Sequence, residues 1–139
     1  MRFFITPEFA EALSLIVKKK KDGYTTCPLD ISNELKNKTA DELWNTLPVL
    51  VNGSYTRTIK ARVANSGLNM GQSSGFRLIY TIHKEKEEII LMYIFPKTGR
   101  LGRLNISADE LKDIYKKMIS YKLSNELIEV DIRKFYLNF

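Results

Sequence analysis

The sequence has very few of the residues that build metal centres and covalent cross-links. Its 139 residues include one cysteine, Cys27, and one histidine, His83. A single cysteine cannot form an internal disulfide and is compatible with a reducing cytoplasm, where we expect the protein to be located. One histidine and one cysteine are too few for the usual metal shell, so we expect no metal site and no cofactor. A magnesium site made of carboxylates alone stays open on this reasoning.

Several common sequence motifs are also missing. No apolar run has the roughly 20 residues that a membrane helix needs, and Met1-Arg2 leads into Phe3-Phe4-Ile5 without a signal-peptide pattern. We therefore expect no membrane partner. There is no P-loop and no dinucleotide fingerprint, which argues against the common nucleotide-dependent enzymes. A Ser-His-Asp triad would depend on His83, which we interpret as an exposed residue beside a charged turn.

What the sequence does have is positive charge, and one segment carries all of it. The net charge is +6, and residues 57–103 contain nine Lys or Arg but only three acids, Glu85, Glu87 and Glu88. The rest of the chain has 13 residues of each sign and is neutral. Charge concentrated in this way predicts a polyanionic partner, either a nucleic acid or an acidic protein.

The basic segment has the pattern of an antiparallel sheet. We expect strands over 56–64, 75–82 and 88–95, with a Gly-, Ser- and Asn-rich loop over 65–74 and a charged turn over 83–87. The run from Ile89 to Phe95 is apolar at every position, which is typical of a central strand buried on both faces.

The flanking segments predict helices on both sides of this sheet. After a short strand over 2–5, Thr6 and Pro7 begin a helix whose end, Lys18–Lys21, we interpret as solvated. Residues 24–55 predict one or two short helices, the second with a capping start at Thr39. A capping box at Ser107 begins another helix, and 124–139 has helical spacing, with a strand over 128–132 as the alternative.

Together these patterns predict one α+β domain over residues 1–139. We expect a small antiparallel-rich sheet of about four strands, packed against two or three N-terminal helices and followed by a C-terminal helix. The expected core covers 1–119, and 120–139 is a C-terminal extension. The sequence leaves open whether that extension docks on the basic face, extends the core or mediates dimers.

Three consecutive segments of the basic region resemble a known family. They are Lys60-Ala61-Arg62-Val63-Ala64, then Ser74-Gly75-Phe76-Arg77-Leu78-Ile79-Tyr80, then Ile90–Ile94 followed by Pro96-Lys97-Thr98-Gly99-Arg100. With the capped helix from Ser107, they resemble the core of RelE/HigB-type toxins of the RelE/ParE toxin–antitoxin superfamily. The resemblance covers about residues 55–118, is architectural over 1–54 and does not extend over 120–139. It implies a RelE-like fold.

The resemblance also implies a function. RelE/HigB-type toxins of type II toxin–antitoxin systems are metal-independent, ribosome-dependent mRNA endonucleases, or mRNA interferases, that inhibit translation. The 2′-hydroxyl attacks the adjacent phosphate and leaves a 2′,3′-cyclic phosphate, which requires a base, an acid and cations for the developing charge. The implied partners are a cognate antitoxin, mRNA in the ribosomal A site and ribosomal RNA.

Carried over by position, the resemblance assigns site residues on the two basic strands and the loop after the last strand. Lys60 and Arg62 alternate along one strand, so both point to one face. Phe76 follows a glycine, and we expect it to be partly exposed and able to stack on a base. The implied catalytic residues are Lys60, Arg62, Arg77, Lys97 and Arg100. The implied RNA-binding residues are Arg57, Phe76, Thr98 and Arg103.

The sequence departs from the family at the proton-transfer position. Some members place a tyrosine or a histidine late in the basic loop, whereas residues 100–104 contain neither. A lysine whose pKa is depressed by neighbouring cations is our hypothesis for this role. Two other functions stay open: a ParE-like gyrase poison, and a catalytically degenerate relative that binds nucleic acid or protein. The basic residues favour RNA cleavage. For Arg77, pairing with an acid of the first helix is the structural alternative.

Overall fold

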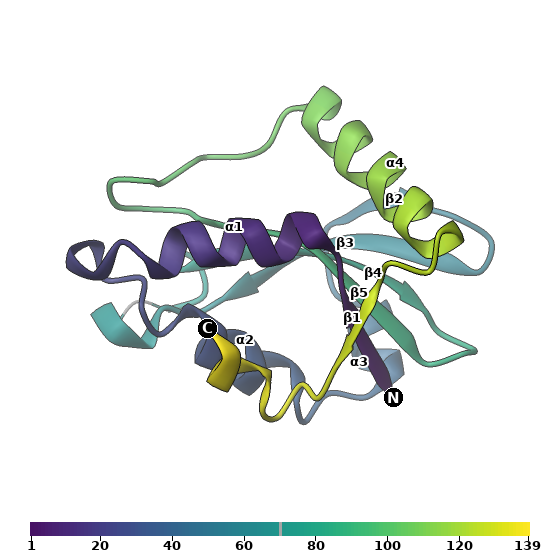
Figure 1. Cartoon of the computed structure of the whole chain (residues 1–139), viewed down its shortest axis with the longest axis horizontal. Coiled ribbons are helices and arrows are strands. Elements are labelled where there is room, and N and C mark those ends of the chain that lie inside the picture. The colour runs from purple at the N-terminus through teal and green to yellow at the C-terminus, as the bar shows by residue number, and fades with distance from the viewer. Residues whose placement is uncertain (70) are drawn as a thin grey trace.

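The computed structural model describes residues 1–69 and 71–139. The described chain is an α+β fold with one six-stranded mixed sheet and four α-helices (Figure 1). The strands are β1 (Arg2–Ile5), β2 (Val49–Asn52), β3 (Thr56–Val63), β4 (Phe76–His83), β5 (Glu88–Pro96) and β6 (Ile128–Val130). The helices are α1 (Pro7–Val17), α2 (Cys27–Leu35), α3 (Ala40–Trp44) and α4 (Ala108–Leu123), with 3-10 turns η1 (Lys20–Asp22), η2 (Ser66–Leu68) and η3 (Phe135–Asn138).

The sheet has the strand order β2-β3-β4-β5-β1-β6. Strands β3, β4 and β5 are antiparallel, as expected, and β1 runs parallel to β5. The expectation of about four strands is wrong, because β2 and β6 add an edge strand at each side. Both edges are short, and short edge strands carry little of the alternation that marks a strand in a sequence.

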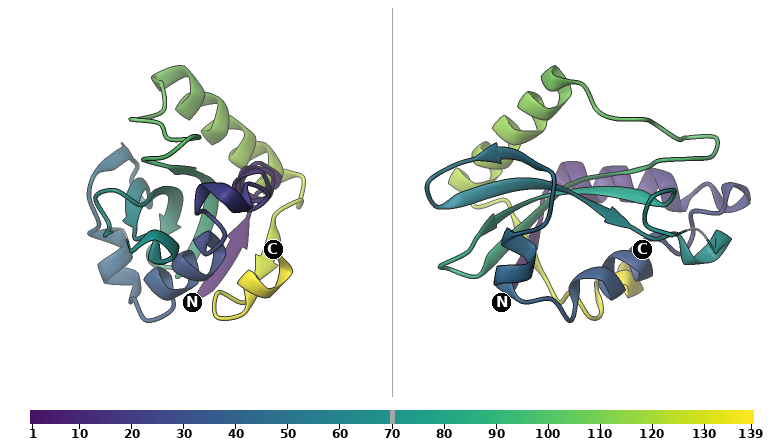
Figure 2. Two further views of the ribbon diagram at one scale, coloured as in Figure 1. Left: turned by 90° about the vertical axis from the view of Figure 1, so that its left-hand side faces the viewer. Right: turned by 180° about the vertical axis from the view of Figure 1, so that it is seen from behind.

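Helices cover both faces of the sheet. On one face, buried side chains of α1 and α2 pack against those of β3, β4, β5 and β1, and Leu13, Ile31 and Tyr80 of this cluster are fully buried. On the other face, Ile114 and Met118 of α4 pack against β4 and β5. Figure 2 shows α4 on the opposite side of the sheet from α2 and α3. Among the described residues, no helix is both long and apolar enough to cross a membrane.

The helix starts agree with the capping patterns. The Thr6 hydroxyl accepts a hydrogen bond from the Phe9 amide at 3.1 Å, and Pro7 occupies the first turn of α1. Full capping boxes form at Thr39 and Ser107, each with a glutamate three residues later. Such caps satisfy amides that the first helical turn leaves without partners.

The C-terminal segment extends the core. The expected helix over 124–139 is wrong, and the alternative of a strand over 128–132 agrees with β6, which spans Ile128–Val130 and pairs antiparallel with β1; within this segment only η3 is helical. Helix α4 also continues to Leu123, across the expected boundary at residue 120. Ile132 and Phe135 are buried, and the Ile132 carbonyl accepts a hydrogen bond from the Ser32 hydroxyl at 2.6 Å. The free edge of β1 and the apolar surface of α2 therefore determine the conformation of this segment.

Candidate functional site

In the second half of strand β3, apolar side chains on one face of the sheet alternate with basic side chains on the other. Ile59, Ala61 and Val63 are buried in the core beneath α1 and α2. Lys60 and Arg62 alternate with them and therefore lie on the opposite face, the one that α4 partly covers. The prediction that Lys60 and Arg62 share one face is confirmed.

Two further cations join them from the neighbouring strands. Arg77 of β4 lies directly opposite Arg62 in the antiparallel register, and Lys97 follows the last residue of β5. Partial burial, and next the charges of Arg77, Lys97 and Arg62, lower the pKa of Lys60 below its usual 10.5. The structure thus brings together four of the five expected catalytic residues. We call these four residues, Lys60, Arg62, Arg77 and Lys97, the cationic cluster.

Arg77 is the buried member of the cluster. Its side chain is held by backbone carbonyls, and the residue is only 6% exposed. One terminal nitrogen donates to the carbonyls of Gln72 and Phe76, and the other donates to the carbonyl of Ser73 at 2.8 Å. Pairing of Arg77 with an acid of the first helix is therefore wrong for the described structure. The guanidinium instead fixes the loop that precedes β4.

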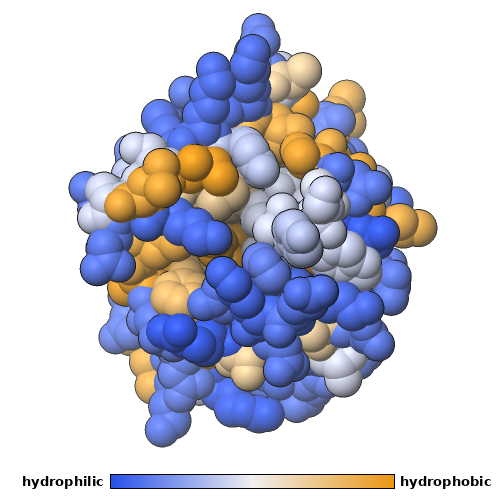
Figure 3. Space-filling model, turned by 90° about the vertical axis from the view of Figure 1, so that its right-hand side faces the viewer, coloured by the Kyte–Doolittle hydropathy of each residue, from blue (hydrophilic) through white to orange (hydrophobic). Residues whose placement is uncertain are grey.

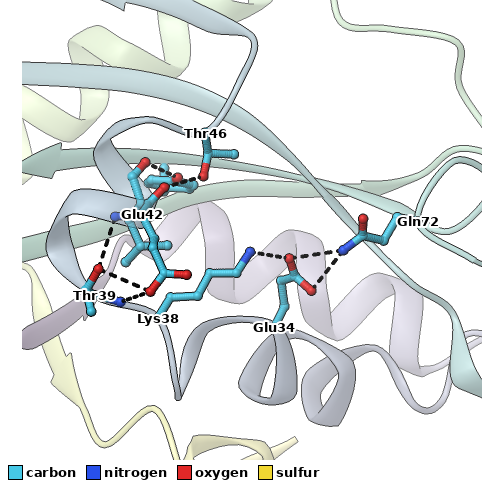
Figure 4. A network of polar contacts seen from close by, with 8 residues as sticks. Glu34, Lys38, Thr39, Glu42, Thr46 and Gln72 are labelled. Carbon is cyan, nitrogen blue, oxygen red and sulfur yellow. Dashed lines mark hydrogen bonds and ion pairs between the residues drawn. The ribbon is translucent and has the colours of Figure 1, made fainter.

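Helix α2 holds the same loop from its other side. The Gln72 side chain donates to both carboxylate oxygens of Glu34 at 3.2 Å, and Glu34 also pairs with Lys38 at 2.6 Å (Figure 4). The Gln72 side chain binds α2, and the Gln72 backbone carbonyl accepts a hydrogen bond from Arg77. Gln72 therefore joins α2 to the cationic cluster. The position of Arg77 therefore depends on helix α2 as well as on its own strand.

The loop after β5 folds back toward the cluster. The Lys60 ammonium donates to the Asn105 side-chain oxygen at 2.9 Å, and the Lys97 ammonium donates to the Leu104 carbonyl at 2.8 Å. Both acceptors are uncharged. None of the ion pairs formed by the described residues includes a member of the cationic cluster. Their positive charge is therefore not neutralised by a neighbouring carboxylate.

Arg103 attaches this loop to α4. One of its terminal nitrogens contacts both carboxylate oxygens of Glu110, at 2.6 and 2.8 Å, and its guanidinium carbon lies 5.8 Å from the centre of the Phe95 ring. Hydrogen bonding from Arg103, and then from the Ser107 amide, lowers the pKa of Glu110 to about 2. Arg103 is therefore engaged in a contact that positions the loop, in addition to any role toward RNA.

Thr98 and Arg100 occupy different positions in the loop. The Thr98 hydroxyl donates to the Ser74 carbonyl at 2.9 Å, which joins the loop after β5 to the loop before β4. Arg100 is exposed two residues further along. In the described structure Arg100 is not among the charges that shift the pKa of Lys60. We therefore place Arg100 at the edge of the site.

Two expected RNA-binding residues lie on the other face of the sheet. The expectation that Phe76 is partly exposed is wrong: it is 0% exposed and packs edge-on against Tyr24, with ring centres 6.1 Å apart. Phe76 therefore has no surface on which a base can stack. The Arg57 guanidinium lies 4.3 Å from the ring centre of Trp44 and donates to the Trp44 carbonyl. Arg57 holds β3 against α3, and the structure does not bring it to the cationic cluster.

The structure adds a hydroxyl group that the sequence reasoning did not assign to the site. Tyr93 pairs with Ile79 across β4–β5, and Ile79 pairs with Lys60 across β3–β4, so Tyr93 lies in the same row of the sheet as Lys60. The hydrogen bond to Glu110 is the main reason that the pKa of the Arg103 guanidinium is raised, and the nearby Tyr93 phenol adds a smaller contribution, which places Tyr93 close to Arg103. The sequence held one signal for this placement. Tyr93 and Phe95 are two residues apart on the same strand, so both rings face the side of the sheet that α4 covers.

A hollow lined by both polar and apolar side chains lies at the opposite end of the sheet. It has a volume of about 250 Å³ and is lined by Arg2, Phe4, Glu88, Ile90, Lys122, Asn125 and Leu127. Figure 3 views the molecule from this end and shows hydrophobic side chains gathered around a hollow. Glu88 begins β5, whereas the cationic cluster lies beside the start of β4 and the end of β5. The hollow and the cluster are therefore separate features.

Neither a group of metal-binding side chains nor a comparison with known proteins suggests another function for the site. Residues 1–69 and 71–139 contain no group of three or more His, Cys, Asp or Glu side chains placed to hold a metal ion. No protein-family model, curated protein or solved structure matches this chain. The arrangement of the cationic cluster and the sequence resemblance therefore carry the functional argument.

Proposed function

We propose that this protein is a toxin of a type II toxin–antitoxin system that cleaves mRNA in the ribosomal A site without a metal. The supporting observation is the cationic cluster: Lys60, Arg62, Arg77 and Lys97 meet on one face of the sheet without a carboxylate partner among the described residues. Preorganised cations at a phosphate stabilise the charge that develops in the transition state, which is often the largest catalytic contribution.

The order of elements supports the same proposal. The resemblance implies a strand, then helices, then a three-stranded antiparallel unit and a helix. The described chain has β1, α1 to α3, the antiparallel unit β3-β4-β5 and then α4 in that order. Because a fold alone does not determine activity, this agreement supports the family while the cluster supports the chemistry.

The proposed reaction is a transesterification within the RNA. The 2′-oxygen forms a bond to phosphorus as the bond from phosphorus to the 5′-oxygen breaks, which yields a 2′,3′-cyclic phosphate and a 5′-hydroxyl. Lys60, in its neutral form, accepts the proton of the 2′-hydroxyl, since its lowered pKa makes that form more accessible than in an ordinary lysine. Arg62 and Lys97 stabilise the charge on the phosphate oxygens.

We assign proton donation to the 5′-oxygen to Tyr93. Lys60 and Tyr93 are separated by one intervening strand, which places their backbones about 10 Å apart. A phosphate over Ile79 would lie between the two side chains. Arg77 acts in a different way, because its donors are already engaged with carbonyls: it fixes the loop before β4 and adds positive potential.

The proposal also implies protein and RNA partners. A cognate antitoxin with an acidic or helical segment would cover the cationic cluster, and ribosomal RNA would contact the same basic face. Complementary charge speeds such encounters and suppresses wrong partners. If the proposal holds, we expect a small open reading frame beside this gene to encode that antitoxin.

Induced expression in bacteria tests the proposal. We compare the wild type with Lys60→Met, and use Lys116→Met, an exposed lysine of α4, as the matched control. Growth arrest with translation-dependent mRNA cleavage that Lys60→Met abolishes, and Lys116→Met retains, supports the mRNA interferase. Arrest with intact mRNA and damaged DNA would indicate a gyrase poison, and absence of arrest would indicate a degenerate binding protein. Arg77→Ala is less suitable here, because it also releases a loop.

A further inference from the structure

A second group of cations lies outside the site described above. Helix α1 ends at Val17 with Lys18 as its cap, and the next three lysines continue into η1. The interpretation of Lys18–Lys21 as a helix end therefore applies only to the first lysine, since the dipole effect falls off within a turn. All four lysines are exposed, and none takes part in an ion pair with another described residue. The nearest acid in the chain is Asp22.

This lysine turn, Lys18–Lys21, is attached to the loop that carries Lys97 and Arg100. The hydroxyl of Tyr24 donates to the Thr98 carbonyl at 2.9 Å and accepts from the Leu101 amide at 3.1 Å. Gly99 has a φ of 85° and packs on the same phenol, because a Cβ at this position would collide with the Tyr24 hydroxyl.

The loop on the other side of the cluster is attached to the same turn. The Asn65 side-chain amide donates to the Gly23 carbonyl at 2.9 Å, and the Leu68 side chain fills the space in which a Cβ of Gly23 would lie. Figure 1 and Figure 2 show the end of α1 and the loop after β5 at the same end of the molecule. The lysine turn thus has a fixed place beside the two loops that border the cationic cluster.

We propose that Lys18–Lys21 is a second RNA-binding site, which holds the phosphate backbone of the same strand that reaches the cationic cluster through Arg100. This inference rests on the proposed function, because it takes RNA as the ligand. Lysines bind phosphates as point charges and need no matching shape, so an exposed run suits a continuous single strand. The protein therefore engages an RNA longer than the scissile dinucleotide.

The test measures RNA binding without cleavage. Fluorescence anisotropy follows binding of 2′-O-methyl oligouridylates of 4 and 16 nucleotides, which lack the attacking hydroxyl, over a range of salt concentrations. The proteins are the wild type, a variant with glutamine at all four positions (K18Q/K19Q/K20Q/K21Q), and the control K112Q/K116Q, which changes exposed lysines of α4. Melting temperatures check that the exposed substitutions leave the fold intact.

The quadruple variant is expected to lose affinity for the 16-mer and keep the wild-type affinity for the 4-mer. The slope of log affinity against log salt should become shallower by about 0.7 for each phosphate of the single strand that the variant no longer neutralises. Equal binding of the 16-mer by this variant, the control and the wild type would overturn the inference. Poly-glutamate serves as a third probe: a loss of affinity by the quadruple variant for poly-glutamate but not for the 16-mer would indicate an acidic protein partner and would also overturn the inference. If the inference fails in either way but Arg62→Gln still weakens binding of the 4-mer, the proposed function is not contradicted.

Discussion

Arg62 and Arg77 lie directly opposite each other across β3 and β4, with their side chains on the same face of the sheet. Like charges in this relationship repel, and such pairs destabilise a sheet. The two arginines differ in how they are accommodated: Arg77 is buried against three carbonyls, whereas Arg62 is exposed. An anion bound beside Arg62 would offset the repulsion, so a phosphate of a bound RNA is expected to stabilise this pair.

Replacing Arg62 is expected to change the stability of the fold and the affinity for RNA in opposite directions. Arg62→Gln removes the repulsion, and we expect the free energy of unfolding to rise by about 0.2–1 kcal/mol, the usual range for a cross-strand charge pair. The same change removes a cation that would bind phosphate, so RNA affinity falls. Urea denaturation and RNA titration measure the two effects, with Lys116→Gln as a control of equal charge change. A less stable Arg62→Gln protein would contradict the account.

The pH dependence of cleavage reports on Lys60. Its pKa in the folded protein lies below the usual 10.5, so the neutral amine becomes available, and the rate rises, as the pH increases toward that lowered pKa. The rise should level off below pH 10.5. Burial is the largest cause of the lowered pKa, and the charges of Arg77, Lys97 and Arg62 follow in that order, so Arg62→Gln is expected to move the rise only slightly to higher pH. Single-turnover rates across pH for both proteins check this, and a wild-type rate that does not rise between neutral pH and pH 10.5 would contradict the assignment of Lys60 as the base.

Arg77 is expected to matter for structure as well as for activity. Arg77→Met leaves the carbonyls of Gln72 and Ser73 without their donor, and we expect a loss of stability of about 1.5–3 kcal/mol, the worth of one hydrogen bond to a charged group. Arg77→Lys keeps the charge but not the forked donors, so it should recover only part of that loss. Denaturation curves, with amide exchange over residues 72–76, measure both. Unchanged exchange in Arg77→Met would contradict the structural role.

The contact between Arg103 and Glu110 is expected to stabilise the fold at neutral pH and to lose this effect in acid. The folded-state pKa of Glu110 is about 2, below its usual 4.5, so its contribution is complete above pH 4.5 and is lost as the pH falls toward 2. Wild type is therefore expected to melt at a higher temperature than Glu110→Gln at neutral pH, and the difference should shrink between pH 4.5 and 2. Asp109→Asn, also in the first turn of α4, is the control and should show a smaller effect.

Local patterns were sufficient to predict the strands and caps that build the site. The alternation of Lys60 and Arg62 with apolar residues placed both on one face, and the hydroxyl-to-glutamate spacing at Ser107 located the start of α4. The same alternation also explains two wrong or unsupported assignments. Phe76 is adjacent to Arg77, and Arg57 is three residues from Lys60, so neither can share the face of its charged neighbour in a regular strand.

Other features depend on contacts between distant segments and leave no local signal. Strand β6 exists because β1 offers a free edge, and residues 128–130 read equally well as part of a helix. The Gln72 carbonyl that accepts a hydrogen bond from Arg77 belongs to a residue whose side chain binds Glu34, in another part of the chain, and no local pattern shows this pairing. The place of Tyr93 beside Arg103 likewise depends on how the loop after β5 folds back onto the sheet.

The central claim is that the cationic cluster cleaves mRNA on the ribosome. The most direct measurement maps mRNA ends after the purified protein is added to ribosomes stalled with an open A site, and determines the chemistry of each 3′ end. We predict A-site cuts with 2′,3′-cyclic phosphate ends for the wild type and Lys116→Met, and none for Lys60→Met or Lys97→Met. Intact mRNA with the wild-type protein, or full cleavage by both Lys60→Met and Lys97→Met, would contradict it.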